Sequence, residues 1–392
     1  MPKIERIEVF VTDLPQRLQR QLAHGTWDTG PSKDILGKPV LVKLYAGGIV
    51  GYGQIRPFSP GHIAPETTQG MITAITELYG PRLLGRDLFD IEENSPIFDQ
   101  VLPGNQAARA VLDHAQHDAM GKAVGLPVYS LLGGLCQADI PLEWSIGMAD
   151  NPSEIIAEAL RAVSDFGMRV LCVKAGDKRG WEHDVNNFVA VRRAVGDGVL
   201  LGIDPNTAWT VDTTIQALRR LEPYQVGYLE QPIERRDIEG LAEIRRQANG
   251  VPLMADESLF NLNDAFLLAK HRAVDALCIK LYKVGGLRAA KKIAAVAEAS
   301  NIRLNAGGVC AVSQLEAAAT AHFCSSLPRK QVMGAAEYVF GLGAFGPDPL
   351  VPETDFRVSD GFAKTPSAPG LGIMIDEQAL KKLTLVREVV RP

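Results

Sequence analysis

Three acidic residues follow one another at regular intervals, each at the end of an apolar run. Asp204 ends "VLLGID", Glu230 ends "VGYLE" and Asp256 ends "VPLMAD", with 26 residues between successive ends. Singly, such a residue commonly begins a turn or caps the next helix. Three carboxylates at matched spacing indicate a shared role instead. Because like charges held close together repel, they call for a cation, and oxygen ligands of this kind suit Mg²⁺ or Mn²⁺.

Two lysines end further apolar runs of the same type. Lys174 ends "MRVLCVK" and Lys280 ends "VDALCIK". In a dry pocket near cations the pKa of a lysine falls, so that the amine can act as a base near neutral pH. A metal ion beside it would stabilise the oxyanion formed when a proton leaves the carbon next to a carboxylate. The alternative, in which both lysines only form salt bridges with the carboxylates, stays open.

Eight apolar runs, each followed by an amphipathic helical stretch, must position these side chains. Their ends lie 24 to 31 residues apart, which is the length of a strand–helix unit, and eight such units close a barrel. Residues at the carboxyl ends of barrel strands face the active site. The expected strands are 140–148, 168–174, 199–204, 226–230, 251–256, 274–280, 301–306 and 331–337.

The first 130 residues follow a different pattern. Strand-like segments come first, including two runs joined at Gly47-Gly48, a hairpin signal, and helical spacing follows. A polar stretch over 21–37 is too long for a simple connection and predicts a functional loop. The expected fold class is α/β. An α+β capping domain (1–130) would precede a modified (β/α)₈ TIM-type barrel (131–345), and a C-terminal segment (346–392) would return to the cap.

Composition excludes several classes of protein. The chain has 392 residues, a formal net charge of −5 and no basic tract, which argues against nucleic acid or an anionic membrane as partner. No apolar run is long enough for a transmembrane helix. The five cysteines are scattered without CxxC spacing, and the N-terminus lacks the apolar stretch of a signal peptide. A cytoplasmic protein with reduced thiols is expected.

In order and spacing, several segments resemble the enolase superfamily, specifically the muconate lactonizing (muconate cycloisomerase) subgroup of the mandelate racemase/muconate lactonizing enzyme family. The resemblance covers nearly the whole chain. A mandelate racemase-type histidine is missing at the end of the seventh strand, where the chain reads "NAGG". The carrying segments are "HAQHDAMGKAVGLPVYSLLGG", "IDPNTAW", "YLEQP", "ADES", "IKLYKVGGLRAA", "GAAEYVFG" and "PGLGIMIDEQAL".

The resemblance implies a metal-dependent isomerase, with Asp204, Glu230 and Asp256 binding Mg²⁺ (Mn²⁺ is the alternative). It implies Lys174 and Lys280 as acid/base residues on opposite faces of a small carboxylate substrate. The shared step would be removal of the proton alpha to the carboxylate, giving a metal-stabilised enediolate. Relatives are commonly oligomeric, so a homo-oligomer is expected.

The chain departs from the family at Cys172, which replaces the first lysine of the Lys-x-Lys motif. Loss of that positive charge should raise the pKa of Lys174. The departure leaves the substrate open, although a buried cysteine is usually inert packing.

The expected reaction is cycloisomerisation of a muconate-like diacid. Racemisation or epimerisation of an amino-acid derivative and dehydration of a hydroxy acid are the alternatives, because all three share one intermediate. A Schiff-base lyase and a non-catalytic binding protein are more distant hypotheses. Glu337 matches the strand-eight glutamate of the cycloisomerases and is a further catalytic candidate. The expected substrate contacts are His24, Trp27, Arg56, Cys172 and Asn206.

Overall fold

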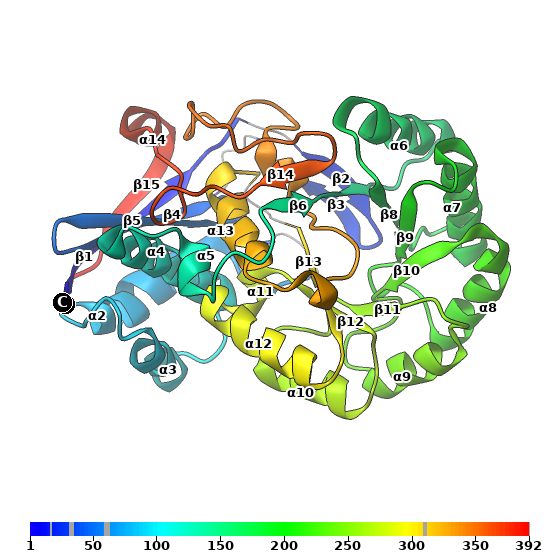
Figure 1. Ribbon diagram of the computed structural model, residues 1–392, viewed down its shortest axis with the longest axis horizontal. Coiled ribbons are helices and arrows are strands. Elements are labelled where there is room, and N and C mark those ends of the chain that lie inside the picture. Colours follow the sequence, from blue (N-terminus) through cyan, green and yellow to red (C-terminus); the bar gives the residue numbers. More distant parts are fainter. Residues whose placement is uncertain (16–17, 31–34, 59–62, 309–311, 392) are drawn as a thin grey trace.

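The computed structural model describes residues 1–15, 18–30, 35–58, 63–308 and 312–391 (Figure 1). An antiparallel sheet with helices on one side lies next to a curved parallel sheet surrounded by helices. This arrangement agrees with the expected barrel and its α+β companion. The domain boundaries given above stay a prediction.

The antiparallel sheet has the strand order β15-β1-β4-β5. Its last strand in sequence, β15, comes from the C-terminal end of the chain and pairs with β1. The expected hairpin at Gly47-Gly48 joins β4 to β5, and both glycines have positive φ (55° and 77°), as a tight turn requires. The strands are β1 (Ile4–Thr12), β4 (Val40–Ala46), β5 (Ile49–Ile55) and β15 (Thr384–Val389).

Helix α4 (Gln106–Val124) joins this sheet to the barrel. Gly51 of β5 lies so close to it that an added Cβ would be 2.1 Å from the Ala115 carbonyl oxygen, so only glycine fits there. On the barrel side, the Asp113 carboxylate accepts a hydrogen bond from the backbone N–H of Leu287 (2.6 Å). The other helices of this region are α1 (Thr68–Thr73), η1 (Ala74–Tyr79), α2 (Gly80–Leu83), α3 (Ile91–Val101) and α5 (Val128–Leu131).

The parallel sheet has seven strands in the order β13-β12-β11-β10-β9-β8-β7, so strands that are consecutive in sequence are also neighbours. The first expected strand is divided, because β6 (Asp139–Pro141) leaves the barrel and pairs with β14 (Phe362–Lys364). The barrel strands are β7 (Glu143–Ile146), β8 (Val170–Lys174), β9 (Leu200–Asp204), β10 (Val226–Glu230), β11 (Leu253–Ala255), β12 (Ala276–Ile279) and β13 (Arg303–Ala306).

The eighth expected strand, 331–337, is wrong as a regular strand. In the described part of the chain this segment pairs through isolated bridges, Val332 with Leu304 of β13 and Ala336 with Leu142 beside β7. The segment therefore still closes the ring between the two edge strands.

The side chain of Asn305 takes part in the irregular pairing. Its side-chain amide donates to the carbonyl oxygens of Met333 (3.2 Å) and Ala335 (2.9 Å). Gly334 between them has φ 66°, which is outside the range of a strand. A side chain thus satisfies backbone acceptors that a strand partner would otherwise satisfy.

The surrounding helices follow the sequence pattern closely. In α8 (Val211–Leu221), Ile215, Leu218 and Leu221 recur at helical spacing and are buried against the sheet, and Thr210 begins the helix through a capping box with Thr213. The other barrel and C-terminal helices are α6 (Pro152–Phe166), α7 (Trp181–Val195), η2 (Glu222–Tyr224), α9 (Ile238–Gln247), α10 (Leu262–Lys270), α11 (Leu281–Val284), α12 (Leu287–Ala299), α13 (Gln314–Ser325), η3 (Arg329–Gln331), η4 (Val339–Leu342) and α14 (Glu377–Leu383).

A small hairpin, β2 (Gln19–Leu22) and β3 (Gly25–Asp28), packs against the barrel. Gln21 accepts a backbone hydrogen bond from Met148, just beyond β7 (3.0 Å). The stretch 21–37, expected to be a loop, is therefore partly strand, although residues 31–34 lie outside the described part. Among the described residues, no helix combines the length and apolar character needed to cross a membrane.

Candidate functional site

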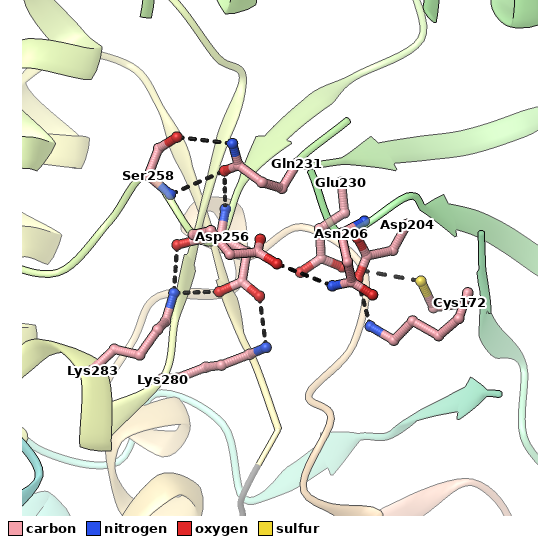
Figure 2. A network of polar contacts seen from close by, with 11 residues as sticks. Cys172, Asp204, Asn206, Glu230, Gln231, Asp256, Ser258, Lys280 and Lys283 are labelled. Carbon is pink, nitrogen blue, oxygen red and sulfur yellow. Dashed lines mark hydrogen bonds and ion pairs between the residues drawn. The ribbon is translucent and has the colours of Figure 1, made fainter. Parts of the chain in front are cut away.

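The strand ends bring the expected charged residues to one end of the barrel (Figure 2). Lys174, Asp204 and Glu230 are the last residues of β8, β9 and β10, and Asp256 and Lys280 directly follow β11 and β12. All five side chains are buried, and both aspartates are 0% exposed. The strand pairing sets Lys174 opposite Asp204, whereas Glu230 lies opposite Met254, so Asp256 is two residues farther along the chain than the partner of Glu230.

The three carboxylates perturb one another. Burial raises the pKa of Asp204 to about 6, and burial together with the charge of Asp204 raises the pKa of Glu230 well above its usual value. Burial alone would also raise the pKa of Asp256, but Lys280 and Lys283 outweigh it and lower this pKa. Charges this close and this buried are the pattern expected around a cation.

Both predicted catalytic lysines form ion pairs with this group. Lys174 Nζ lies 2.5 Å from Asp204 Oδ2, and Lys280 Nζ lies 2.7 Å from Asp256 Oδ2. Burial would lower the pKa of each lysine, but the aspartate partner and the other acidic groups nearby, among them Glu337, together outweigh burial and raise the pKa well above the usual value. In this arrangement both amines are protonated.

Lys283 belongs to the same network and was not predicted. It lies on α11, is 0% exposed, and donates hydrogen bonds to the carboxylate and the backbone carbonyl oxygen of Asp256 (Figure 2). The available signal in the sequence was its position three residues after Lys280, because side chains with this spacing are neighbours on a helical turn. Lys280 and Lys283 thus hold different oxygens of one carboxylate.

A sulfur atom lies beside two of the carboxylates. The Sγ atom of Cys278 and one carboxylate oxygen each of Glu230 and Asp256 lie within 4.8 Å of one another. Cys278 faces the barrel interior with Cys172 and Tyr228, one layer below the strand ends. Burial raises the pKa of both thiols well above the usual value, so both are neutral.

Cys172 lies beneath Lys174, with its Sγ 4.0 Å from Glu230 Oε2. Position 172, where the Lys-x-Lys motif of the family has its first lysine, is therefore uncharged in this chain. Close to it, Glu143 at the start of β7 is buried, and burial together with the charge of Glu337 raises its pKa to about 8.

A cavity of about 490 Å³, including space open to solvent, lies between the β2–β3 hairpin and the barrel mouth. Lys174, Lys280, Asn206 and Glu337 are among its lining residues on the barrel side. Glu337 reaches this place without a regular strand, because its backbone N–H bonds to the Ala306 carbonyl (2.9 Å). The predicted reactive side chains Lys174, Lys280 and Glu337 therefore line the same cavity.

The predicted substrate contacts are distributed more widely. Trp27 and Asn206 line the cavity, whereas Cys172 lies one layer below. Exposed His24 bonds through Nε2 to the Asn206 carbonyl (2.9 Å). Arg56 donates to the carbonyls of the last residue of β3 and of the residue after it. His24 and Arg56 thus support the hairpin, and direct substrate contact by either stays a prediction.

Comparison with known proteins places the chain among enzymes. Residues 154–379 match the family described as enolase C-terminal domain-like, and residues 6–133 match the N-terminal domain of mandelate racemase/muconate lactonizing enzymes. A chloromuconate cycloisomerase from Pseudomonas putida is 31% identical, over 97% of this chain and 99% of the relative.

Two solved structures cover nearly all of both chains. The N-succinyl Arg/Lys racemase from Bacillus cereus has a TM-score of 0.88 at 29% identity, with 99% of this chain and 100% of that chain covered. The dipeptide epimerase from Enterococcus faecalis, complexed with Mg and the dipeptide L-Leu-L-Tyr, has a TM-score of 0.84 at 31% identity, with 95% and 99% covered. The relatives therefore agree in fold and differ in reaction.

Proposed function

Because this chain belongs to the mandelate racemase/muconate lactonizing enzyme family of the enolase superfamily and is an isomerase, we propose that it removes the proton alpha to a substrate carboxylate with the help of Mg²⁺. One observation carries the proposal. Three buried carboxylates on successive strand ends are flanked by a lysine on each side, and both lysines line the same cavity.

Asp204, Glu230 and Asp256 would hold the metal ion. Their oxygen donors suit Mg²⁺, and burial, which raises the pKa values of Asp204 and Glu230, disfavours their negative charge unless a cation compensates it. When bound, the ion would supply compensation for the negative charge that develops on the substrate carboxylate. A relative crystallised with Mg supports the choice of ion.

Lys174 and Lys280 would move the proton. They lie at the ends of β8 and β12, with three strands between them, so each amine would approach a different face of the substrate. A base must be neutral, so each lysine must lose its proton and its carboxylate partner before it accepts the substrate proton. Glu337 lies on the same cavity and would be a further acid/base group.

Cycloisomerisation of a muconate-like diacid is the reaction that we favour. Its support is the relative that carries this activity and the glutamate at position 337. Racemisation or epimerisation of an amino-acid derivative is the second candidate, because two amines on opposite faces suit removal and return of a proton at one carbon.

The test is incorporation of solvent deuterium at the alpha carbon. Muconates, N-acylamino acids, dipeptides, proline derivatives and sugar acids would be incubated in D₂O and examined by NMR and mass spectrometry. We expect exchange that stops with EDTA and returns with Mg²⁺, and no exchange in the Asp256→Asn variant. Exchange that persists in EDTA, or its absence from every carboxylate, would contradict the proposal.

A further inference from the structure

The hairpin that covers the cavity presents a single charged group to it. On and before β2, Leu18, Arg20 and Leu22 alternate along the chain and all three line the cavity. Trp27 of β3 stands opposite Arg20 in the strand register and stacks on Phe58 (4.8 Å between ring centroids). Among the described residues that line the cavity from the first 130 positions, Arg20 is the one with a charge.

The Arg20 side chain is held on several sides, yet one of its nitrogen donors has no acceptor. Its Nη2 lies 2.7 Å from Glu158 Oε1 on α6, and its Nη1 donates to the Gln19 carbonyl (3.2 Å). The guanidinium lies 4.9 Å from the ring centroid of Phe340, which also lines the cavity. The Nε atom is buried and has no hydrogen-bond partner in the part of the chain that the structure describes.

A buried N–H without an acceptor is costly, and a guanidinium has five N–H donors in a planar fork that matches a carboxylate. Glu158 and Gln19 accept at the two Nη atoms, so the Nε–H of this cavity-lining side chain is the donor that still needs an acceptor. The side chain is only 12% exposed, so water screens its charge weakly. The Phe340 ring lies against the guanidinium and adds a cation–π contact.

We infer that Arg20 is the specificity-determining residue for a second anionic group of the substrate. The substrate class would be a carboxylate whose distal anion is separated from the reacting end by an apolar segment. Leu18, Leu22 and Trp27 would contact that segment, while Lys174 and Lys280 act at the other end. This inference rests on the proposed function, because the reacting end is placed by the two lysines. A distal ammonium group would meet the guanidinium and be disfavoured.

Arg20 could instead only tie the hairpin to α6 through Glu158. Two variants separate these roles. Arg20→Met removes the cation and keeps an apolar side chain in the cavity wall. Glu158→Gln removes the ion pair and keeps Arg20, and is the matched control.

The experiment measures binding of α,ω-dicarboxylates, from succinate to suberate, and of the monomethyl ester of each, by isothermal titration calorimetry with Mg²⁺ present. The wild type should bind at least one diacid more tightly than its ester. In Arg20→Met the affinity for that diacid should fall about 10- to 100-fold, as expected for loss of a hydrogen bond between charged groups, while affinity for the ester changes little. Glu158→Gln should bind the diacid as well as the wild type or better.

Absence of any preference for a diacid in the wild type would overturn the inference. So would an Arg20→Met variant that keeps the preference, or a Glu158→Gln variant that loses affinity for diacid and ester as Arg20→Met does. Deuterium exchange in the wild type is scored separately. A diacid preference without exchange would contradict the proposed function and leave the role of Arg20 standing.

Discussion

The barrel mouth and the hairpin above it build two sides of one cavity by different means. On the barrel side, charged side chains project from strand ends and hold one another in buried ion pairs, such as Lys280 with Asp256. On the hairpin side, apolar residues alternate along a short strand and surround one guanidinium, that of Arg20. The barrel side, where ion pairs hold the charged groups, suits chemistry that must be placed accurately, and the hairpin side suits selection among substrates.

If the two sides of the cavity have these roles, substitutions at the barrel mouth should lower the turnover of every substrate, whereas substitutions in the hairpin should alter which substrate is bound. The largest effect is expected for Lys280→Ala. Because the variant lacks a proton-transfer group, kcat should fall about 10²- to 10⁴-fold. The matched hairpin variant Trp27→Leu should change KM more than kcat.

Steady-state kinetics on the best substrate of the deuterium screen would measure both variants. Mn²⁺ binding, followed by EPR, would show that the metal site of Lys280→Ala persists. A Trp27→Leu variant that lost kcat as strongly as Lys280→Ala would remove the distinction between the two sides.

A smaller effect is expected for Lys283→Met. This variant tests whether the barrel side also needs residues that only orient a metal ligand. Lys283 is 0% exposed and holds Asp256 from behind, so its removal should leave this ligand less well oriented. Loss of such an indirect contact typically weakens metal binding about 10- to 100-fold. Breaking a buried ion pair should also lower the Tm of the metal-free protein.

Mn²⁺ titration by EPR and thermal unfolding would measure these two effects. Lys292→Met is the control, because Lys292 lies on the exposed part of α12 and pairs with Glu92. Unchanged or tighter metal binding in Lys283→Met would show that Asp256 needs no such support.

The smallest effect is expected for Cys172→Lys, which sharpens the role of the neutral position beneath Lys174. A second ammonium would lower the pKa of Lys174, so the neutral amine would form at lower pH and the acidic limb of the pH–rate profile would move downward. Glu143, whose pKa is about 8, would pair with the new lysine and offset part of this shift. The same substitution with Glu143→Gln should therefore give the larger displacement. An unchanged profile in both backgrounds would refute the charge argument.

Several features were predictable from sequence because they depend on short-range patterns. Apolar runs at 24- to 31-residue spacing gave the parallel strands, and the last polar residue of each run gave the carboxylates and lysines of the mouth. The Gly47-Gly48 turn was predictable because it requires positive φ. The family resemblance is confirmed over both regions that the family descriptions cover. Roles of single residues, oligomeric state and cellular location stay predictions.

Other features escaped prediction because they depend on contacts across the chain. Isolated bridges replace the eighth expected strand, and the side-chain amide of Asn305 bonds to this segment from 28 and 30 residues away. Arg20 was not singled out from the sequence, because its place between Glu158 and Phe340 depends on the fold.

The sequence by itself therefore determined which residue types stand at the strand ends and which reaction class they suit, since strand order in a parallel barrel follows chain order. Only the tertiary structure decided how those charges are paired and what covers them. Pairing at Asp256 depends on burial and on distances of a few ångströms to Lys280 and Lys283, and chain spacing does not encode these. The electrostatic environment of the site, and with it the substrate, is a property of the packed molecule.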